Sequence, residues 1–213
     1  MPLYRIGSTK VLFIHIPKTA GMALDAHLSA HGTAVFKDPI TTYTGVFRPR
    51  HRPAAVLEQI YLPETIDYAF TVVRHPVARL VSGYRYQRRH RHLQLSRLRF
   101  LGFDAWLRYC LWRAQAEVDY RDGHFRPQVE YPCFGCDVFR YEDGLAAVME
   151  RVNRVTGAAL PQHPPARNIS PFRPVTIAKS SLDLIARFYA ADFERFGYTV
   201  AVPPIKGVTL RGA

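Results

Sequence analysis

Hydrophobic residues recur along the chain in two patterns, short unbroken runs and longer stretches with helical spacing. Residues 10–16 (KVLFIHI) and 68–73 (YAFTVV) are almost wholly apolar and rich in β-branched residues, which is typical of strands covered on both faces. After Pro76, apolar residues recur at the intervals of one helix face. The chain therefore combines buried strands with amphipathic helices.

The same reading assigns the rest of the chain. Further strands are predicted over residues 33–36 and 136–141, and helices over residues 21–30, 53–61, 103–119, 144–155 and 181–196, the last ended by Gly197. Residues 38–52 and 161–174 are predicted to be loops. Strands that alternate with helices predict an α/β fold, with a central parallel β-sheet flanked by helices. The length of 213 residues suits a single domain over residues 1–213.

The charge narrows the class of partner. A formal net charge of +12 favours anions, such as a nucleotide, nucleic acid, an acidic glycan or a membrane surface. The first ten residues do not resemble a secretory signal, and no apolar run is long enough to span a membrane. We therefore expect a cytoplasmic protein, although a lumenal domain cut from a longer chain would look the same.

Three cysteines are too few for a disulfide framework. Cys133-x-x-Cys136 could supply half of a zinc site, but no second pair accompanies it, and Cys110 stands alone. We expect buried or unreactive thiols and no bound metal.

A first anion site is predicted where the strand over residues 10–16 meets the next helix. The connection is Pro17-Lys18-Thr19-Ala20-Gly21. A helix that starts directly after a strand points its N–H groups and the positive end of its dipole at the strand's carboxyl end. Gly21 allows an anion to approach the backbone, while Lys18 adds a charge and Thr19 a hydroxyl. Taken alone, the segment could equally be a plain turn with a surface lysine.

A second anion site is predicted after the strand over residues 68–73. Arg74 follows the strand, and Ser82 lies eight residues later, about two turns along the next helix. The two side chains can meet on one phosphate. An exposed arginine and a solvent-facing serine would give the same sequence.

Together, and in this order, the two sites resemble the signature of the carbohydrate sulfotransferases that use 3′-phosphoadenosine-5′-phosphosulfate (PAPS). This family includes Golgi-type heparan sulfate 2-O- and chondroitin/dermatan 4-O-sulfotransferases and bacterial relatives. Residues 13–21 are similar to the 5′-phosphosulfate loop, and residues 74–84 to the 3′-phosphate motif. Residues 124–128, 133–143, 168–170 and 189–198 add weaker similarity.

The resemblance implies a P-loop-like nucleotide-binding sulfotransferase fold, PAPS as donor and 3′-phosphoadenosine-5′-phosphate (PAP) as product. The implied donor-binding residues are Pro17, Lys18, Thr19, Ala20, Gly21, Met22, Ala23, Arg74 and Ser82. Met22 and Ala23 depart from the family, which usually has hydroxyl residues there. Backbone N–H groups can still bind the 5′-phosphate, so we expect slightly weaker donor binding.

The same resemblance assigns the reaction. Lys18 is expected to stabilise the leaving oxygen, because a compact ammonium can follow the growing negative charge. The family places a histidine in the loop some twenty-odd residues before the 3′-phosphate arginine, and His51 stands there. His51 is therefore the first candidate for the general base and His124 the second.

The acceptor is less defined. Residues 85–99 are strongly basic, and no acidic residue occurs between Asp67 and Asp104. This stretch could be a solvated helix face or a surface for an acidic or phosphorylated glycan. No nucleic-acid motif accompanies it, so we expect a carbohydrate or another hydroxyl-bearing acceptor and no nucleic acid. The alternatives are a phosphate-loop kinase or NTPase, which lacks its Walker residues here, and a non-catalytic glycan-binding protein.

Overall fold

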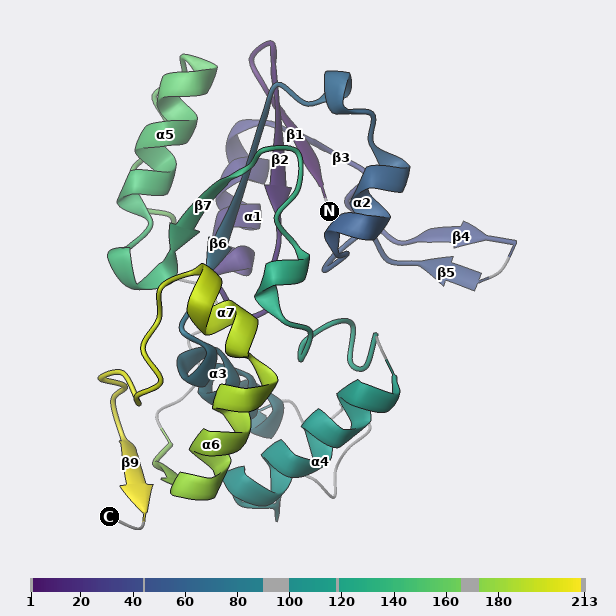
Figure 1. The fold of residues 1–213 in the computed structure, drawn as a ribbon. Helices are drawn as coiled ribbons and strands as arrows, with labels where there is room; N and C mark the ends of the chain where they lie inside the picture. The colour runs from purple at the N-terminus through teal and green to yellow at the C-terminus, as the bar shows by residue number, and fades with distance from the viewer. Residues whose placement is uncertain (1, 44, 90–99, 118, 166–172, 212–213) are drawn as a thin grey trace. The chain divides into compact units, whose positions relative to one another are not determined.

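The computed structural model describes residues 2–43, 45–89, 100–117, 119–165 and 173–211. The chain forms two compact units (Figure 1). The first unit comprises Met1–Val73 and Glu130–Asn168, and the second comprises Arg74–Val129 and Ile169–Ala213. The expectation of a single domain over residues 1–213 stays a prediction.

A five-stranded sheet organises the first unit. Its strands lie in the order β3 (Thr33–Val35), β1 (Leu3–Ile6), β2 (Thr9–Ile14), β6 (Tyr68–Val73) and β7 (Asp137–Arg140). The pairs β2–β6 and β6–β7 are parallel, whereas β1 is antiparallel to both of its neighbours. It follows that β3 points the same way as β2, so the sheet is mostly parallel. The α/β fold class is confirmed.

The helices of the first unit are α1 (Gly21–His31), α2 (Ala54–Ile60) and α5 (Ala146–Thr156). Leu24 and Leu28 of α1 and Val152 of α5 share a core with Phe13 and Phe70 from the sheet. Two short 3-10 turns, Pro63–Thr65 and Tyr141–Asp143, follow α2 and β7. Every residue of β6 is buried, as its unbroken apolar sequence predicts.

The second unit is mainly helical. It holds α3 (Pro76–Arg89), α4 (Phe103–Ala116), α6 (Lys179–Phe188) and α7 (Ala190–Arg195), with a parallel pair of short strands, β8 (Val175–Ala178) and β9 (Val208–Arg211). A 3-10 turn spans Gln128–Glu130. Its separate core includes Leu80, Trp106, Leu107, Ile177 and Ile185.

Two sequence predictions need correction. The loop predicted over residues 38–52 contains an antiparallel hairpin of β4 (Ile40–Thr42) and β5 (Gly45–Phe47), whose strands are too short to show a pattern. The helix predicted over residues 181–196 is broken at Tyr189, where the backbone leaves the helical region. Strands β1, β8 and β9 were also not predicted. Parts of the predicted loop over 161–174 and of the basic stretch lie outside the described residues.

Candidate functional site

The loop between β2 and α1 has an unusual backbone. Lys18 and Ala20 both have positive φ angles, 70° and 71°, a conformation that residues with a side chain seldom adopt. Such a residue costs about 1–3 kcal/mol and persists only where the surrounding structure enforces it, often at a ligand site. The Thr19 side chain is fully buried, and its hydroxyl donates to the Ile16 carbonyl at 2.9 Å. Thr19 therefore closes the loop with its hydroxyl, whose proton is already donated within the chain.

Helix α1 begins at Gly21 with an open N-terminus. No side chain caps it, and its first turn carries no acidic residue. The Ala20 carbonyl accepts the N–H groups of Ala23 and Leu24, so the Gly21 and Met22 amides precede the first helical hydrogen bonds. The Met22 side chain is exposed and that of Ala23 buried. Backbone N–H groups and the helix dipole thus dominate the chemistry of this end.

Gly21 packs directly against the His15 ring. A Cβ atom at position 21 would lie only 1.8 Å from Nε2 of His15, which excludes any other residue unless the ring moves. The buried His15 ring stacks on Phe13, with ring centroids 5.4 Å apart. It also makes an edge-to-face contact with the His51 ring, with ring centroids 4.6 Å apart. The first-choice base candidate is therefore linked to the loop glycine through one imidazole.

His51 is itself held in a left-handed conformation, with a φ angle of 58°. Its side chain is half-buried. Lys18, Ala20 and His51 are thus three of the five described non-glycine residues with positive φ in the first unit, and the His15 ring contacts both Gly21, next to Ala20, and His51. An imposed backbone conformation at a base candidate suits a positioned catalytic group.

The second junction, after β6, is built from side chains. The Arg74 N–H donates to Oε1 of Gln128 at 2.9 Å, and Nε2 of Gln128 donates to the Arg74 carbonyl at 2.8 Å. Gln128 is fully buried. Its amide therefore pairs with the Arg74 backbone as a neighbouring strand would, which fixes the residue expected to bind the 3′-phosphate.

Asp192 in turn holds Gln128. Its buried carboxylate accepts the N–H groups of Gln128 and Val129 at 3.0 and 2.9 Å, and the Gln128 side-chain amide at 3.2 Å. Burial raises the pKa of Asp192, while the charge of Arg79 and these hydrogen bonds oppose that rise. The chain Asp192–Gln128–Arg74 links residues far apart in sequence, so no local pattern could have predicted it.

Helix α3 has a closed N-terminus, unlike α1. Its first residue, Pro76, has no N–H group, and the Val77 N–H donates to Nδ1 of His75 at 3.2 Å. Because Nδ1 accepts, Nε2 of His75 carries the proton and donates to the Thr199 carbonyl at 3.0 Å. Ser82 lies half-buried farther along the helix. An anion here would depend on the side chains of Arg74 and Ser82.

His124 is also oriented by its surroundings. Its Nδ1 donates to the Arg121 carbonyl at 2.7 Å, which makes Nε2 the basic nitrogen of the neutral ring. Arg79, almost fully buried, donates through Nη2 to the His124 and Arg126 carbonyls at 3.1 and 2.9 Å. This geometry suits a base whose tautomer is set by its second nitrogen.

A comparison with protein families decides what these features have in common. The model of the sulfotransferase family matches residues 3–199, which is most of the chain. The chain belongs to the sulfotransferase family. No significant match was found among curated proteins or among solved structures.

In this sulfotransferase, the candidate residues are divided between the two units. Lys18 and His51 belong to the first unit, whereas Arg74, Ser82 and His124 belong to the second. Each set is organised within its own unit, as described above. That both sets bind one donor molecule stays a prediction of the sequence.

The cysteines of the sulfotransferase are largely withdrawn from solvent. Cys110 and Cys133 are buried, and burial raises the pKa of each thiol to about 12. A thiol with so high a pKa is a poor nucleophile at neutral pH. Within the described ranges, no group of three or more His, Cys, Asp or Glu side chains is placed to hold a metal ion. The helices in these ranges include none that is both long and apolar enough to cross a membrane.

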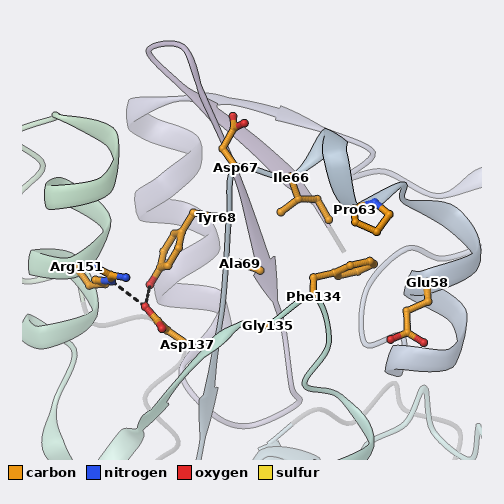
Figure 2. Close-up of a pocket in the computed structure, with 10 residues that line it drawn as sticks. All are labelled: Glu58, Pro63, Ile66, Asp67, Tyr68, Ala69, Phe134, Gly135, Asp137 and Arg151. Atoms are coloured by element: carbon orange, nitrogen blue, oxygen red, sulfur yellow. Dashed lines mark hydrogen bonds and ion pairs between the residues drawn. The ribbon is translucent and has the colours of Figure 1, made fainter.

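A cavity of about 550 Å³ lies where the parallel strands β6 and β7 begin (Figure 2). Tyr68 and Asp137, which line it, are the first residues of the parallel strands β6 and β7, whereas the loop follows the carboxyl end of β2. Asp137 accepts hydrogen bonds from Arg151 at 2.8 Å and from Tyr68 at 2.9 Å, and these, the Arg151 bond above all, hold its pKa below the usual range. The carboxylate is occupied by structural partners, and ligands of such sheets bind at the carboxyl ends. We therefore place the candidate site at the loop.

Proposed function

We propose that this sulfotransferase moves the sulfuryl group of PAPS to a hydroxyl group of an acceptor, a carbohydrate or glycoconjugate. The observation that carries the proposal is the open N-terminus of α1 behind the strained loop of Lys18 and Ala20, in a chain that matches the family over residues 3–199. Backbone N–H groups at a helix N-terminus suit a phosphate, and the net charge of +12 suits an anionic donor.

The proposed reaction is an in-line displacement at sulfur. The acceptor hydroxyl loses its proton to a histidine, and its oxygen forms a bond to sulfur. The bond between sulfur and the bridging oxygen of the donor breaks, so the electron pair and the negative charge pass to the 5′-phosphate of PAP. Lys18 stabilises that charge, and the amides of Gly21 and Met22 hold the phosphate.

The other donor contacts are assigned to the second junction. Arg74 and Ser82 are proposed to hold the 3′-phosphate, and this would explain why the Arg74 backbone is fixed by Gln128. A planar guanidinium suits phosphate because it can form two parallel hydrogen bonds. The pair would select PAPS over nucleotides without a 3′-phosphate.

Donor binding is tested by calorimetric titration. PAP is expected to bind tightly without Mg²⁺, and ATP–Mg²⁺ poorly. Tight ATP–Mg²⁺ binding with no preference for PAP would contradict the proposal and favour a kinase or NTPase. Labelled PAPS with a panel of oligosaccharide, lipid and small-alcohol acceptors then tests transfer. Glycan binding without any transfer would favour a non-catalytic glycan-binding protein.

The base is tested by two matched variants. His51→Ala is expected to lower turnover about 10²–10⁴-fold while PAP affinity stays near that of the wild type. His51 is favoured because its ring contacts His15, which packs on the loop glycine. His124→Ala is the comparison, since the orientation of that ring also suits a base. Wild-type turnover in His51→Ala with a large loss in His124→Ala would reverse the assignment.

A further inference from the structure

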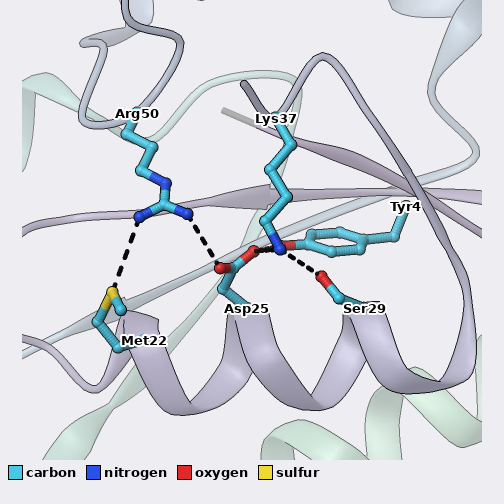
Figure 3. Close-up of polar contacts among 6 residues, drawn as sticks. All are labelled: Tyr4, Met22, Asp25, Ser29, Lys37 and Arg50. Carbon is cyan, nitrogen blue, oxygen red and sulfur yellow. Dashed lines mark hydrogen bonds and ion pairs between the residues drawn. The ribbon is translucent and has the colours of Figure 1, made fainter. Parts of the chain in front are cut away.

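A single buried carboxylate of α1, Asp25, is paired with two cationic side chains. Asp25 of α1 accepts a hydrogen bond from the Tyr4 hydroxyl and forms ion pairs with Lys37 and Arg50, each at 3.3 Å (Figure 3). Its side chain is only 7% exposed. Burial and the neighbouring carboxylate raise the pKa of Tyr4, so the tyrosine stays neutral. One negative charge thus faces two positive charges, and the cluster carries a net charge of +1.

The two cations lie at different levels of α1. Arg50 contacts Met22 through Nη1, 3.8 Å from the sulfur, as well as Asp25 through Nη2. It therefore lies beside the first turn of the helix, which begins at Gly21. Lys37 donates to the Ser29 hydroxyl at 2.8 Å, about one turn farther along (Figure 3). Of the two cations, Arg50 is the one beside the open helix N-terminus.

The chemistry of Arg50 suits a phosphate. A guanidinium carries five N–H groups in a planar fork, and the contacts to Met22 and Asp25 engage two of them. The Asp25 carboxylate fixes one side of the fork, so little side-chain freedom is lost when another anion binds the rest. The side chain is 35% exposed, which leaves it accessible. Met22 and Ala23 bring no hydroxyl to the same turn.

We propose that Arg50 is a donor-binding residue that donates hydrogen bonds to the 5′-phosphosulfate group. It would thereby supply side-chain donors to the first turn of α1, where Met22 and Ala23 have no hydroxyl. Asp25 is its positioning residue. The inference rests on the proposed function, because it takes PAPS as the donor. It assigns the excess positive charge of the cluster to the ligand and explains how a loop with so few hydroxyls would hold its anion.

A positioning role for Arg50 has to be separated from a binding role, since Arg50 precedes His51 and its pairing with Asp25 also anchors that segment. The decisive comparison uses two ligands. PAP carries both phosphates, whereas adenosine 3′-monophosphate lacks the 5′-phosphate. Arg50→Gln is expected to weaken PAP binding about 10- to 100-fold, as for lost hydrogen bonds to a charged group, and to leave binding of adenosine 3′-monophosphate within about twofold.

Lys37→Gln is the matched control. It removes the same charge from the same carboxylate but one turn away from the loop, so it should change PAP affinity by less than about threefold. Arg50→Lys keeps the charge and loses the fork, and should fall between Arg50→Gln and the wild type. It also serves as the test variant if Arg50→Gln unfolds, as judged by thermal unfolding.

The outcomes separate this inference from the proposed function. If the wild-type protein binds no PAP, the proposed function fails and the inference falls with it. If the wild type binds PAP but Arg50→Gln weakens both ligands equally, or weakens neither, the proposed function stands and Arg50 is not a 5′-phosphosulfate ligand. An equal loss in Lys37→Gln would also overturn the inference, because it would reduce the effect to general charge.

Discussion

The two strand-to-helix junctions differ in how they could recognise an anion. Helix α1 has an open N-terminus, with backbone N–H groups as its donors. Helix α3 starts with Pro76, and His75 takes the Val77 N–H, so its backbone offers little. The first junction depends on the shape of the main chain and the second on the identity of side chains. We therefore predict that substitution at Met22 or Ala23 changes donor binding less than substitution at Arg74.

The difference also appears in how each junction is supported. The first is held by local contacts: the Thr19 hydroxyl on the Ile16 carbonyl and the His15 ring against Gly21. The second is held over long sequence separations, by Gln128 and Asp192. An anion site made of backbone N–H groups depends on neighbouring contacts that hold the loop in its strained conformation. An anion site made of side chains depends on contacts that fix the backbone carrying those side chains.

Of the changes that test this comparison, the largest effect is expected at Lys18, the one side-chain charge of the first junction loop. Lys18→Met should lower turnover about 10²–10³-fold, because the leaving oxygen loses its charge partner in the transition state. PAP affinity should fall much less. Steady-state rates with PAPS and titration with PAP measure the two quantities. A large loss of PAP affinity with unchanged turnover would show instead that Lys18 only binds the ground state.

The next effect tests the second junction. Arg74→Lys should weaken PAP binding about 10-fold, since an ammonium cannot reproduce the two parallel hydrogen bonds of a guanidinium. Binding of adenosine 5′-monophosphate, which lacks the 3′-phosphate, should change by less than about twofold. Equal losses for both nucleotides would mean that Arg74 is not specific for the 3′-phosphate, and the contrast between the junctions would disappear.

The smallest effect sharpens the comparison at the first junction. Met22→Ser adds a hydroxyl to an exposed position of the first turn and should strengthen PAP binding by at most about fivefold, the worth of one neutral hydrogen bond, because Arg50 is proposed to contact the same phosphate. Met22→Leu adds no donor and should leave the affinity unchanged. Calorimetric titration measures both. A gain well above fivefold would show that the backbone and Arg50 leave the phosphate poorly bound, against the role proposed for Arg50.

The sequence predicted the parts of this fold that have a local cause. The strand over residues 68–73 and the starts of the helices at Gly21, Pro76 and Phe103 are confirmed, because unbroken apolar runs and helix-starting prolines act within a few residues. The break at Tyr189 has a tertiary cause. Its hydroxyl donates to the Phe125 carbonyl at 2.8 Å, while the amphipathic pattern continues past it. No periodicity reports such a contact.

The candidate site shows the same division. Motif and spacing, which need only neighbours in the chain, predict Lys18, Gly21, Arg74 and Ser82 as site residues. His15 lay inside the motif, but its packing against Gly21 and His51 depends on how a later loop folds back. The pairing of Gln128 with Asp192 joins residues 64 positions apart. The sequence shows both residues but carries no signal that they are hydrogen-bonded to each other.

Because the His15 ring touches both Gly21 and His51, a substitution at position 21 can affect two parts of the candidate site. Any side chain at position 21 must displace a ring that also touches His51, so one substitution is predicted to disturb both the proposed donor loop and the base candidate. Substitution at position 51 alone is therefore expected to remove catalysis while the donor loop stays intact, whereas substitution at position 21 is expected to affect both. We expect a relative that binds the donor but no longer catalyses transfer to keep glycine at position 21 and to lack histidine at position 51. That combination of residues would identify non-catalytic members among its relatives.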